Sequence, residues 1–294
     1  MSRLPLKRKL STILIVVIVI AIATIFLYNF NASTLSGKPQ EDCAVTFVDV
    51  GQGDSTIISC GGEHALIDAG ENNSIENVLV KLRELNISRL KYVIGTHAHI
   101  DHIGALDEVI RKVEVENVIL YDVPSKLMPD TEGYDELLDA VDDVGTDIIW
   151  ANAKQEFSIG GGKLTILAPT KSPDSLNNAS IISKFEYGKS SFLFTGDAEQ
   201  AAELSLIASK ADISADVLKV AHHGADTSSC KQFLLKVKPK WAVIEVGRYN
   251  SNGHPSPDVL SRLTDIGAEI HRTDLCGDIV ASTDGKKIWF SCEK

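Results

Sequence analysis

The sequence predicts a mixed α/β protein in which two sheets stack face to face and helices cover their outer faces. Short apolar runs typical of strands alternate with amphipathic segments typical of helices. The order of strands first, then alternating strands and helices, occurs in both halves of the chain, which favours two sheets. The 294 residues suffice for one large or two small cores, and 44% hydrophobic with 23% charged residues indicate a globular chain rather than a disordered one.

The N-terminus contains an apolar run over residues 10–27, interrupted only by three hydroxyl residues. As a helix, these 18 residues extend about 27 Å, close to the thickness of a bilayer core. Basic side chains directly before the run place the N-terminus in the cytoplasm by the positive-inside rule: Arg3, Lys7, Arg8 and Lys9. We expect residues 1–28 to be a single-pass signal anchor in the cell membrane, 29–42 a linker, and 43–294 an extracellular domain. If the run is cleaved as a signal peptide, the protein is secreted.

The five cysteines suggest an oxidising compartment. Cys43 and Cys60 stand at the outer ends of two strand-like runs that a tight turn joins. Cys276 and Cys292 flank a second candidate hairpin near the C-terminus. We expect two cross-strand disulfides, with Cys230 left over. The alternative is that all five are small buried hydrophobic residues.

The body between these hairpins alternates strand and helix patterns. The first half predicts strands near 44–50, 55–60, 64–68 and 91–95, with helices near 74–86 and from Ala105. The second half predicts strands near 163–168, 181–187, 190–195, 216–220 and 241–246, helices near 198–208, 229–236 and 256–265, and a last hairpin. The acidic stretch from Asp130 to Asp147 predicts a helix with a solvated face.

Charge is distributed unevenly along the chain. Residues 1–40 contain five Lys or Arg and no acidic residue, so the other 24 basic residues share the chain from Glu41 onward with all 40 acidic residues. A body this acidic repels a polyanion at long range, which argues against a plain DNA-binding module that lacks bound metal ions.

The strongest chemical signal is THAHIDHIG, which places four potential metal ligands within six residues after an apolar strand pattern: His97, His99, Asp101 and His102. A loop leaving a strand end can point alternate residues to one side, so two of them can bind one metal and two a second. A polar surface loop whose histidines have no role is the alternative.

Three further motifs can complete a metal centre. Asp197 follows the apolar run FLFTG, where a carboxylate can bridge two cations. His222 and His223 follow the buried-strand pattern DVLKVA, and His254 lies in the turn NGHPSP. Together at strand ends on one rim, these side chains are the ligand set of a binuclear hydrolase.

The ordered series of motifs resembles the metallo-β-lactamase fold and, within it, the extracellular hydrolase domain of ComEC-type DNA-uptake competence proteins. The resemblance covers roughly residues 43–292, through DVGQGDS, LIDAG, THAHIDHIG, NNASIISKFEYGKSSFLFTGD, DVLKVAHHGADTSS, NGHPSPDVLSRL and HRTDLCGDIV. It implies a four-layer αββα sandwich that carries a metal-dependent hydrolase. The polytopic channel of ComEC proteins has no counterpart in this sequence, so their transport role is not carried over.

The resemblance implies a first metal site on His97, His99 and Asp197. The broader fold usually adds a histidine between the THAHIDHIG loop and Asp197, where this sequence has Asn177, Asn178 and Ser180 instead. The first site is therefore expected to be weak, completed by water or empty, and the metal count of one or two stays open. Histidine mixed with carboxylate suits Zn or Mn better than a thiolate-loving ion.

A second metal site is implied to share the bridging carboxylate of Asp197 and to use three further side chains: Asp101, His102 and one histidine of the 222–223 pair. We favour His223 as the ligand and His222 as the histidine that faces the substrate. The reverse assignment stays open.

Other positions are expected beside the ligands. Asp49, Asp54 and Asp68 can each hold a ligand imidazole by its second nitrogen or simply form turns; the turn role is favoured for Asp49. The family pattern HHGSxxS reads HHGADTS here, which leaves Ser228 near a possible phosphate. His254 suits a proton donor to a leaving oxygen or a phosphate contact, the alternative being a turn histidine with no role.

Divalent ions bound here would lower the pKa of a bound water from about 15.7 toward about 7 and polarise an oxyanion. The sequence thus predicts a membrane-anchored extracellular phosphodiesterase or nuclease, with DNA as one candidate substrate and no protein partner indicated. Asp101 and Asp197 would position the attacking group, and His222 or His254 would assist departure. The alternatives are a metallohydrolase for a small or cell-wall ester, amide or lactone, such as a phosphocholine ester, and a non-catalytic binding module.

Overall fold

The computed structural model describes residues 42–128 and 132–294. Residues 41–294 form a compact unit of their own. The predicted anchor at 1–28 and nearly all of the predicted linker lie outside the described residues. Among the helices that are described, none combines the length and apolar character needed to cross a membrane.

The first sheet has eight strands in the order β15-β14-β1-β2-β3-β4-β5-β6. Neighbours are antiparallel from β15 to β3 and parallel from β3 to β6. Their bounds are β1 (Cys43–Phe47), β2 (Thr56–Cys60), β3 (Glu63–Ile67), β4 (Arg89–Ile94), β5 (Glu114–Leu120), β6 (Asp147–Trp150), β14 (Ile279–Thr283) and β15 (Ile288–Cys292).

The second sheet has seven strands in the order β13-β12-β11-β10-β9-β8-β7. It is antiparallel from β7 to β10 and parallel from β10 to β13. Its strands are β7 (Glu156–Ile159), β8 (Gly162–Ala168), β9 (Ile182–Tyr187), β10 (Ser190–Phe194), β11 (Val217–Lys219), β12 (Trp241–Ile244) and β13 (Glu269–Arg272). The predicted two-sheet α/β architecture is confirmed.

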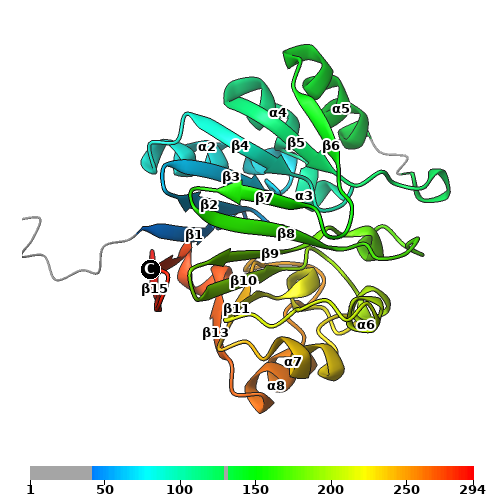
Figure 1. The fold of residues 1–294 in the computed structure, drawn as a ribbon, viewed down its shortest axis with the longest axis vertical. Coiled ribbons are helices and arrows are strands. Elements are labelled where there is room, and N and C mark those ends of the chain that lie inside the picture. The colour runs from blue at the N-terminus through cyan, green and yellow to red at the C-terminus, as the bar shows by residue number, and fades with distance from the viewer. Residues whose placement is uncertain (1–41, 129–131) are drawn as a thin grey trace, which may run out of the picture. The chain divides into compact units, whose positions relative to one another are not determined.

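Three apolar clusters hold the four layers together. The central cluster lies between the sheets, where Phe47 and Phe194 pack with ring centroids 6.5 Å apart. The other two clusters lie under the helices on the outer faces, so each sheet is covered on one side by helices (Figure 1). The first sheet carries α2 (Ile75–Glu84), α4 (Leu106–Lys112) and α5 (Glu132–Val144), and the second carries α6 (Gln200–Ala208), α7 (Lys231–Val237) and α8 (Pro257–Asp265).

Short helices complete the connections: α3 (Ile100–Ile103), α9 (Thr273–Cys276), and the 3₁₀ turns η1 (Asn72–Ser74), η2 (Ser125–Leu127), η3 (Asn177–Ala179) and η4 (Ala221–Gly224). Strands β5, β6, β7 and β13 were not predicted from the sequence. Each has exposed or half-buried positions, so its hydrophobic pattern is weaker than that of a central strand. The C-terminal hairpin joins the first sheet beside β1, which a pattern of local elements does not reveal.

The acidic helix α5 is solvated on one face only. Tyr134, Leu137 and Val141 are buried against the first sheet's helical layer, whereas Asp135 and Asp139 are exposed. The helical period therefore separates the acidic side chains from the core.

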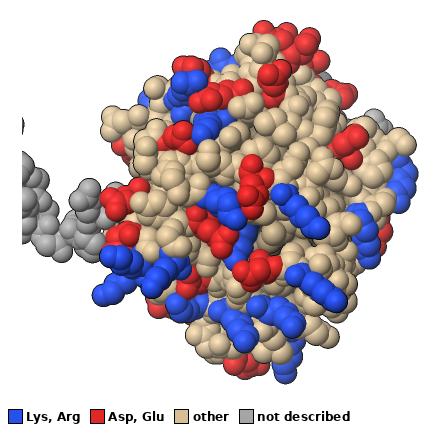
Figure 2. All heavy atoms as spheres, in the orientation of Figure 1, with Lys and Arg blue, Asp and Glu red and all other residues tan. Residues whose placement is uncertain are grey.

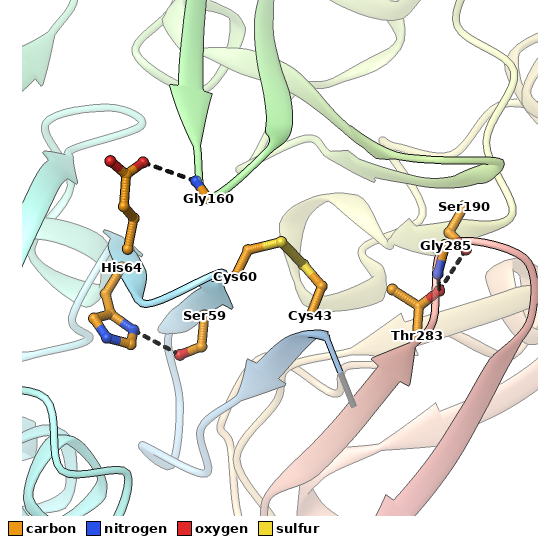
Figure 3. The surroundings of a disulfide bond; sticks show 9 residues. Cys43, Ser59, Cys60, His64, Gly160, Ser190, Thr283 and Gly285 are labelled. Carbon is orange, nitrogen blue, oxygen red and sulfur yellow. Dashed lines mark hydrogen bonds between the residues drawn. A yellow bond between two sulfur atoms is a disulfide. The ribbon is translucent and has the colours of Figure 1, made fainter. Parts of the chain in front are cut away.

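One of the two predicted disulfides is present. Cys43 and Cys60 are direct partners in the β1–β2 ladder, with Cα atoms 4.2 Å apart, and are bonded (Figure 3). The second prediction is wrong in this structure, because Cys276 and Cys292 are thiols. Cys292 pairs across the hairpin with Ile279, while Cys276 belongs to α9 and not to the ladder.

Candidate metal centre

The predicted ligands reach one edge of the sandwich because they follow strands at their carboxyl ends. The THAHIDHIG loop leaves β4 and runs into α3. Asp197 follows β10, and His223 follows β11 in the turn η4. Since β10 and β11 are parallel neighbours, their carboxyl ends lie side by side.

Four side chains converge on one point, each offering a ligand atom within 4.8 Å of the others: Asp101, His102, Asp197 and His223. His223 Nε2 lies 3.2 Å from Asp101 Oδ2, and His102 Nε2 lies 3.1 Å from Asp197 Oδ1. These last two atoms are buried and form no hydrogen bond with any described residue. Two imidazoles and two carboxylates, of which His102 and Asp197 each have an unpartnered atom, fit a divalent cation such as Zn or Mn.

A second group has the three predicted ligands of the first site: His97, His99 and Asp197. His97 Nε2 lies 2.9 Å from His99 Nδ1 and 3.9 Å from Asp197 Oδ2. The side chain of Asn178 is used elsewhere, because its Oδ1 accepts from Glu199 N at the start of α6. With three ligands against four, this group offers a cation fewer bonds than its neighbour.

The two adjacent histidines point differently. The side chain of His223 is 1% exposed and lies among the ligand atoms, whereas that of His222 is 23% exposed, with Nε2 3.6 Å from Asp197 Oδ2. Both residues have a positive backbone φ, 53° for His222 and 51° for His223, a conformation that residues other than glycine adopt only at an energetic cost. The His254 ring centroid lies 5.6 Å from that of His222. The side chains of Asp101, His222 and His254 are partly exposed, and we call this solvent-facing side of the ligand group the opening.

A carboxylate and a backbone carbonyl beneath the ligands fix the imidazole rings of His102 and His223. Asp68 Oδ2 lies 2.9 Å from His102 Nδ1, and Thr96 donates to both oxygens of Asp68. His223 Nδ1 lies 2.9 Å from the backbone carbonyl oxygen of Glu245, its hydrogen-bond partner, and 3.2 Å from Asp54 Oδ1. Each ring is thereby held by Nδ1 and presents Nε2 to the centre.

The remaining predicted positions differ in role. Ser180 Oγ accepts from Asp197 N at 3.0 Å and so supports the shared carboxylate. Asp49 does not join the centre: its Oδ1 accepts from Gly51 N at 3.3 Å, an Asx turn. Ser228 is buried, and its carbonyl accepts from Arg262 Nη2 at 2.9 Å; no contact brings it to the ligands.

A buried ion pair below the centre, Lys219 with Asp54, was not predicted from the sequence. The Lys219 ammonium on β11 forms an ion pair with Asp54. Glu245 Oε1 accepts from Ser55 N at 3.0 Å, and Oε2 accepts from Thr56 Oγ1 at 3.1 Å. The sequence did contain a signal for this pair: Lys219 stands inside the apolar pattern VLKVA, and a buried lysine needs an acidic partner.

The electrostatics favour positive charge at the centre. Burial disfavours the charged His102 and His223 rings, but nearby carboxylates, foremost Asp197, outweigh it: they raise the pKa of His102 well above its usual value and that of His223 to about 10. Burial likewise opposes ionisation of Asp197, yet His102 and His223 hold its pKa well below the usual range. In the absence of a metal, the protonated His102 and His223 rings supply this positive charge. A bound divalent cation can replace it.

Burial, together with the neighbouring Asp54 carboxylate, raises the pKa of Glu245 to about 8. For Lys219, burial lowers the pKa but Asp54 raises it more, so the net shift is upward. The Lys219–Asp54 pair is therefore held in its charged form beneath the rings.

Comparison with known proteins agrees with this geometry. Residues 48–244 match the model of the metallo-β-lactamase superfamily. ComE operon protein 3 of Bacillus subtilis is 28% identical over 93% of this chain and 36% of its own length, and competence protein ComA of Neisseria gonorrhoeae is 28% identical over 81% of this chain and 32% of its own. The chain thus spans about a third of these relatives.

Among solved structures, the β-hydroxylase CmlA (E377D mutant) superposes with a TM-score of 0.57 at 13% identity, covering 84% of this chain and 55% of that one. YhfI of Bacillus subtilis superposes with a TM-score of 0.51 at 14% identity, covering 85% of this chain and all of the other. At these identities the likeness shows the fold alone. The matching family model, together with the ordered ligand motifs, shows that the chain belongs to the metallo-β-lactamase superfamily.

Proposed function

We propose that the protein is a metal-dependent phosphodiesterase of the nuclease type, with DNA as a candidate substrate. The convergence of Asp101, His102, Asp197 and His223 on one point carries the proposal. The fold by itself does not set the reaction, since a β-hydroxylase shares it. The competence proteins related to this chain favour a nucleic-acid substrate.

One or two divalent ions held by the ligand groups would supply Lewis acidity and a nucleophile at neutral pH. The residues of the chain then have distinct tasks. Asp101 is part-exposed and faces the opening, so it can orient an attacking group. His222 and His254 border that opening, where either ring could assist departure of a leaving oxygen. Burial lowers the pKa of His254, which leaves its ring neutral near pH 7 and able to contact a phosphate through its N–H.

The proposal is tested by assaying the protein on bis-p-nitrophenyl phosphate and on single-stranded DNA, after chelation and after adding back Zn²⁺ or Mn²⁺. Metal-dependent cleavage of both substrates is expected. Cleavage of the small ester alone would contradict the nuclease assignment and leave a phosphodiesterase. No cleavage of either would refute both.

A second candidate is a metallohydrolase for a small or wall-bound ester, amide or lactone. The excess of acidic over basic residues from Glu41 onward favours it, because a nuclease usually has a basic track for its substrate. On the face drawn in Figure 2, Lys and Arg are interspersed with Asp and Glu. A choline-phosphate ester that is cleaved faster than DNA would select this candidate; a catalytically inert but metal-loaded protein would favour a binding module instead.

We further propose that residues 1–28 anchor the protein in the cell membrane and hold the hydrolase domain outside. The Cys43–Cys60 disulfide supports an oxidising compartment. Protease treatment of intact cells should digest the domain and spare a short N-terminal fragment in the membrane. A domain protected until the cells are lysed would contradict this topology, and recovery in the medium would show cleavage of the segment.

A further inference from the structure

A second cluster of metal-binding side chains lies outside the candidate centre. His271, Cys276 and Cys292 each offer one ligand atom within 4.8 Å of the others. None of them belongs to the candidate metal centre, and the proposed function uses none of them. They come from two parts of the chain: β13 and α9, which follow each other directly, and β15.

The topology explains why these residues meet. Strand β13 is an edge strand of the second sheet, and β15 is an edge strand of the first. The His271 ring on β13 stacks on Phe290 of β15, with centroids 4.4 Å apart and planes 7° from parallel. Cys276 O also accepts from Lys294 N at 3.0 Å, which ties α9 to the end of the chain. The cluster therefore sits where the lateral edges of the two sheets come together.

The chemistry of the cluster suits a soft cation. Two sulfur ligands and one imidazole are a donor set that Zn²⁺ prefers, with Zn–S near 2.3 Å and Zn–N near 2.0 Å, so the ligand atoms should end about 3.5 to 3.8 Å apart. His271 is 14% exposed, and its Nε2 is buried with no hydrogen bond from the described residues. Glu269 Oε1 lies 3.1 Å from that nitrogen and is a candidate fourth ligand.

The state of the sulfur atoms also distinguishes this cluster. Cys43 and Cys60 are bonded, whereas Cys276 and Cys292 remain thiols beside an imidazole. A disulfide needs no imidazole beside it, whereas a zinc site can use the imidazole as its third protein ligand. We propose that His271, Cys276 and Cys292 bind Zn²⁺ and thereby join the edges of the two sheets, with water or Glu269 as the fourth ligand.

The test uses Co²⁺ as the probe, because cobalt bound to thiolate gives an intense near-ultraviolet band that histidine and carboxylate ligands do not give. The full-length chain, purified without reductant in the presence of Zn²⁺, is chelated and titrated with Co²⁺. We expect a thiolate band that Zn²⁺ abolishes. Asp101→Ala and Cys230→Ser should keep the thiolate band. Cys292→Ser and His271→Asn should either lose the band or bind Co²⁺ at least tenfold more weakly.

Thiol counting on the unfolded, chelated protein gives the independent check. We expect three free thiols, from Cys230, Cys276 and Cys292. A single free thiol would mean that Cys276 and Cys292 form a disulfide, and it would overturn the zinc site. A cobalt titration with no thiolate band would overturn it as well. Neither result depends on hydrolytic activity, so the proposed function stands or falls separately.

Discussion

The paired histidines after β11 show how one residue step changes a role. His223 is buried against Asp54 and the ligand group, while its neighbour His222 reaches the opening. The repeated positive φ turns the two side chains to different sides. Sequence spacing alone could not decide between them, because the decision depends on this backbone conformation.

Substituting each histidine separates the two roles. His223→Ala should lower metal affinity by tenfold or more, since it removes a ligand. His222→Ala should retain the metal and lower kcat, by about 10²-fold if the ring assists departure. Metal content after dialysis, measured beside kcat, tests both variants. If His222→Ala loses the metal and His223→Ala keeps it, the assignment is reversed.

Lys219 is expected to stabilise the site before any metal binds. Lys219→Met leaves the Asp54 carboxylate buried without its partner, which should cost about 3–5 kcal/mol of unfolding free energy. A divalent cation meets that surplus negative charge, so added Mn²⁺ should raise Tm more in the variant than in the parent. Thermal melts with and without Mn²⁺ measure this, and Lys236→Met, an exposed change on α7, is the control. Equal Tm values in the variant and the parent would contradict the role.

Among the elements, the central strands and the motif-bearing loops could be predicted, because their apolar runs are strong and their ligands closely spaced. Edge strands such as β7 and β13 could not, since half-exposed positions blur the period. The ion pair of Lys219 with Asp54 and the hydrogen bonds of Glu245 with residues 55 and 56 could not be predicted either. They join residues from strands and turns of different sheets, and only the stacking of the sheets brings them together.

The first hairpin gains stability from its disulfide. Cys43 and Cys60 are 17 residues apart, and closing a loop of this length stabilises by about 3 kcal/mol in the chain-entropy account. The double change Cys43→Ser with Cys60→Ser should lower the free energy of unfolding by about that amount. Urea denaturation measures it, with Cys230→Ser as the matched single-thiol control. A loss below about 1 kcal/mol would show that the pair contributes little.

Helix α6 carries a buried acid that makes stability depend on pH. Glu203 accepts from the backbone N–H groups of Ser229 and Cys230 ahead of α7, and burial raises its pKa to about 7. Between about pH 4.5 and pH 7 the folded chain keeps a proton that the unfolded chain has released, so stability falls as pH rises through that window, by about 3 kcal/mol.

The free energy of unfolding, measured by urea denaturation at each pH, should therefore fall less steeply with pH for Glu203→Gln than for the parent chain. The difference in slope corresponds to one proton. The Gln side chain cannot accept both N–H groups, so a lower absolute stability is also expected, but it does not affect the comparison of slopes. Parallel slopes would contradict the raised pKa.

At the scale of the whole molecule, two features oppose each other. The chain from Glu41 onward has a large excess of acidic residues, yet its relatives include a competence protein and the substrate proposed for it is a phosphodiester. Bound divalent cations can reconcile the two, because they place positive charge where a phosphate would lie. Catalysis should therefore depend on the metal for substrate binding as well as for chemistry.

The most direct measurement compares metal-dependent hydrolysis of bis-p-nitrophenyl phosphate by the parent protein, by Asp101→Ala and by Asp135→Ala, an exposed change on α5. We predict that chelation abolishes the parent activity, that Asp101→Ala loses at least 10²-fold in kcat/KM, and that Asp135→Ala matches the parent. Hydrolysis that survives chelation, or an Asp101→Ala variant as active as the parent, would contradict a hydrolytic metal centre at this site.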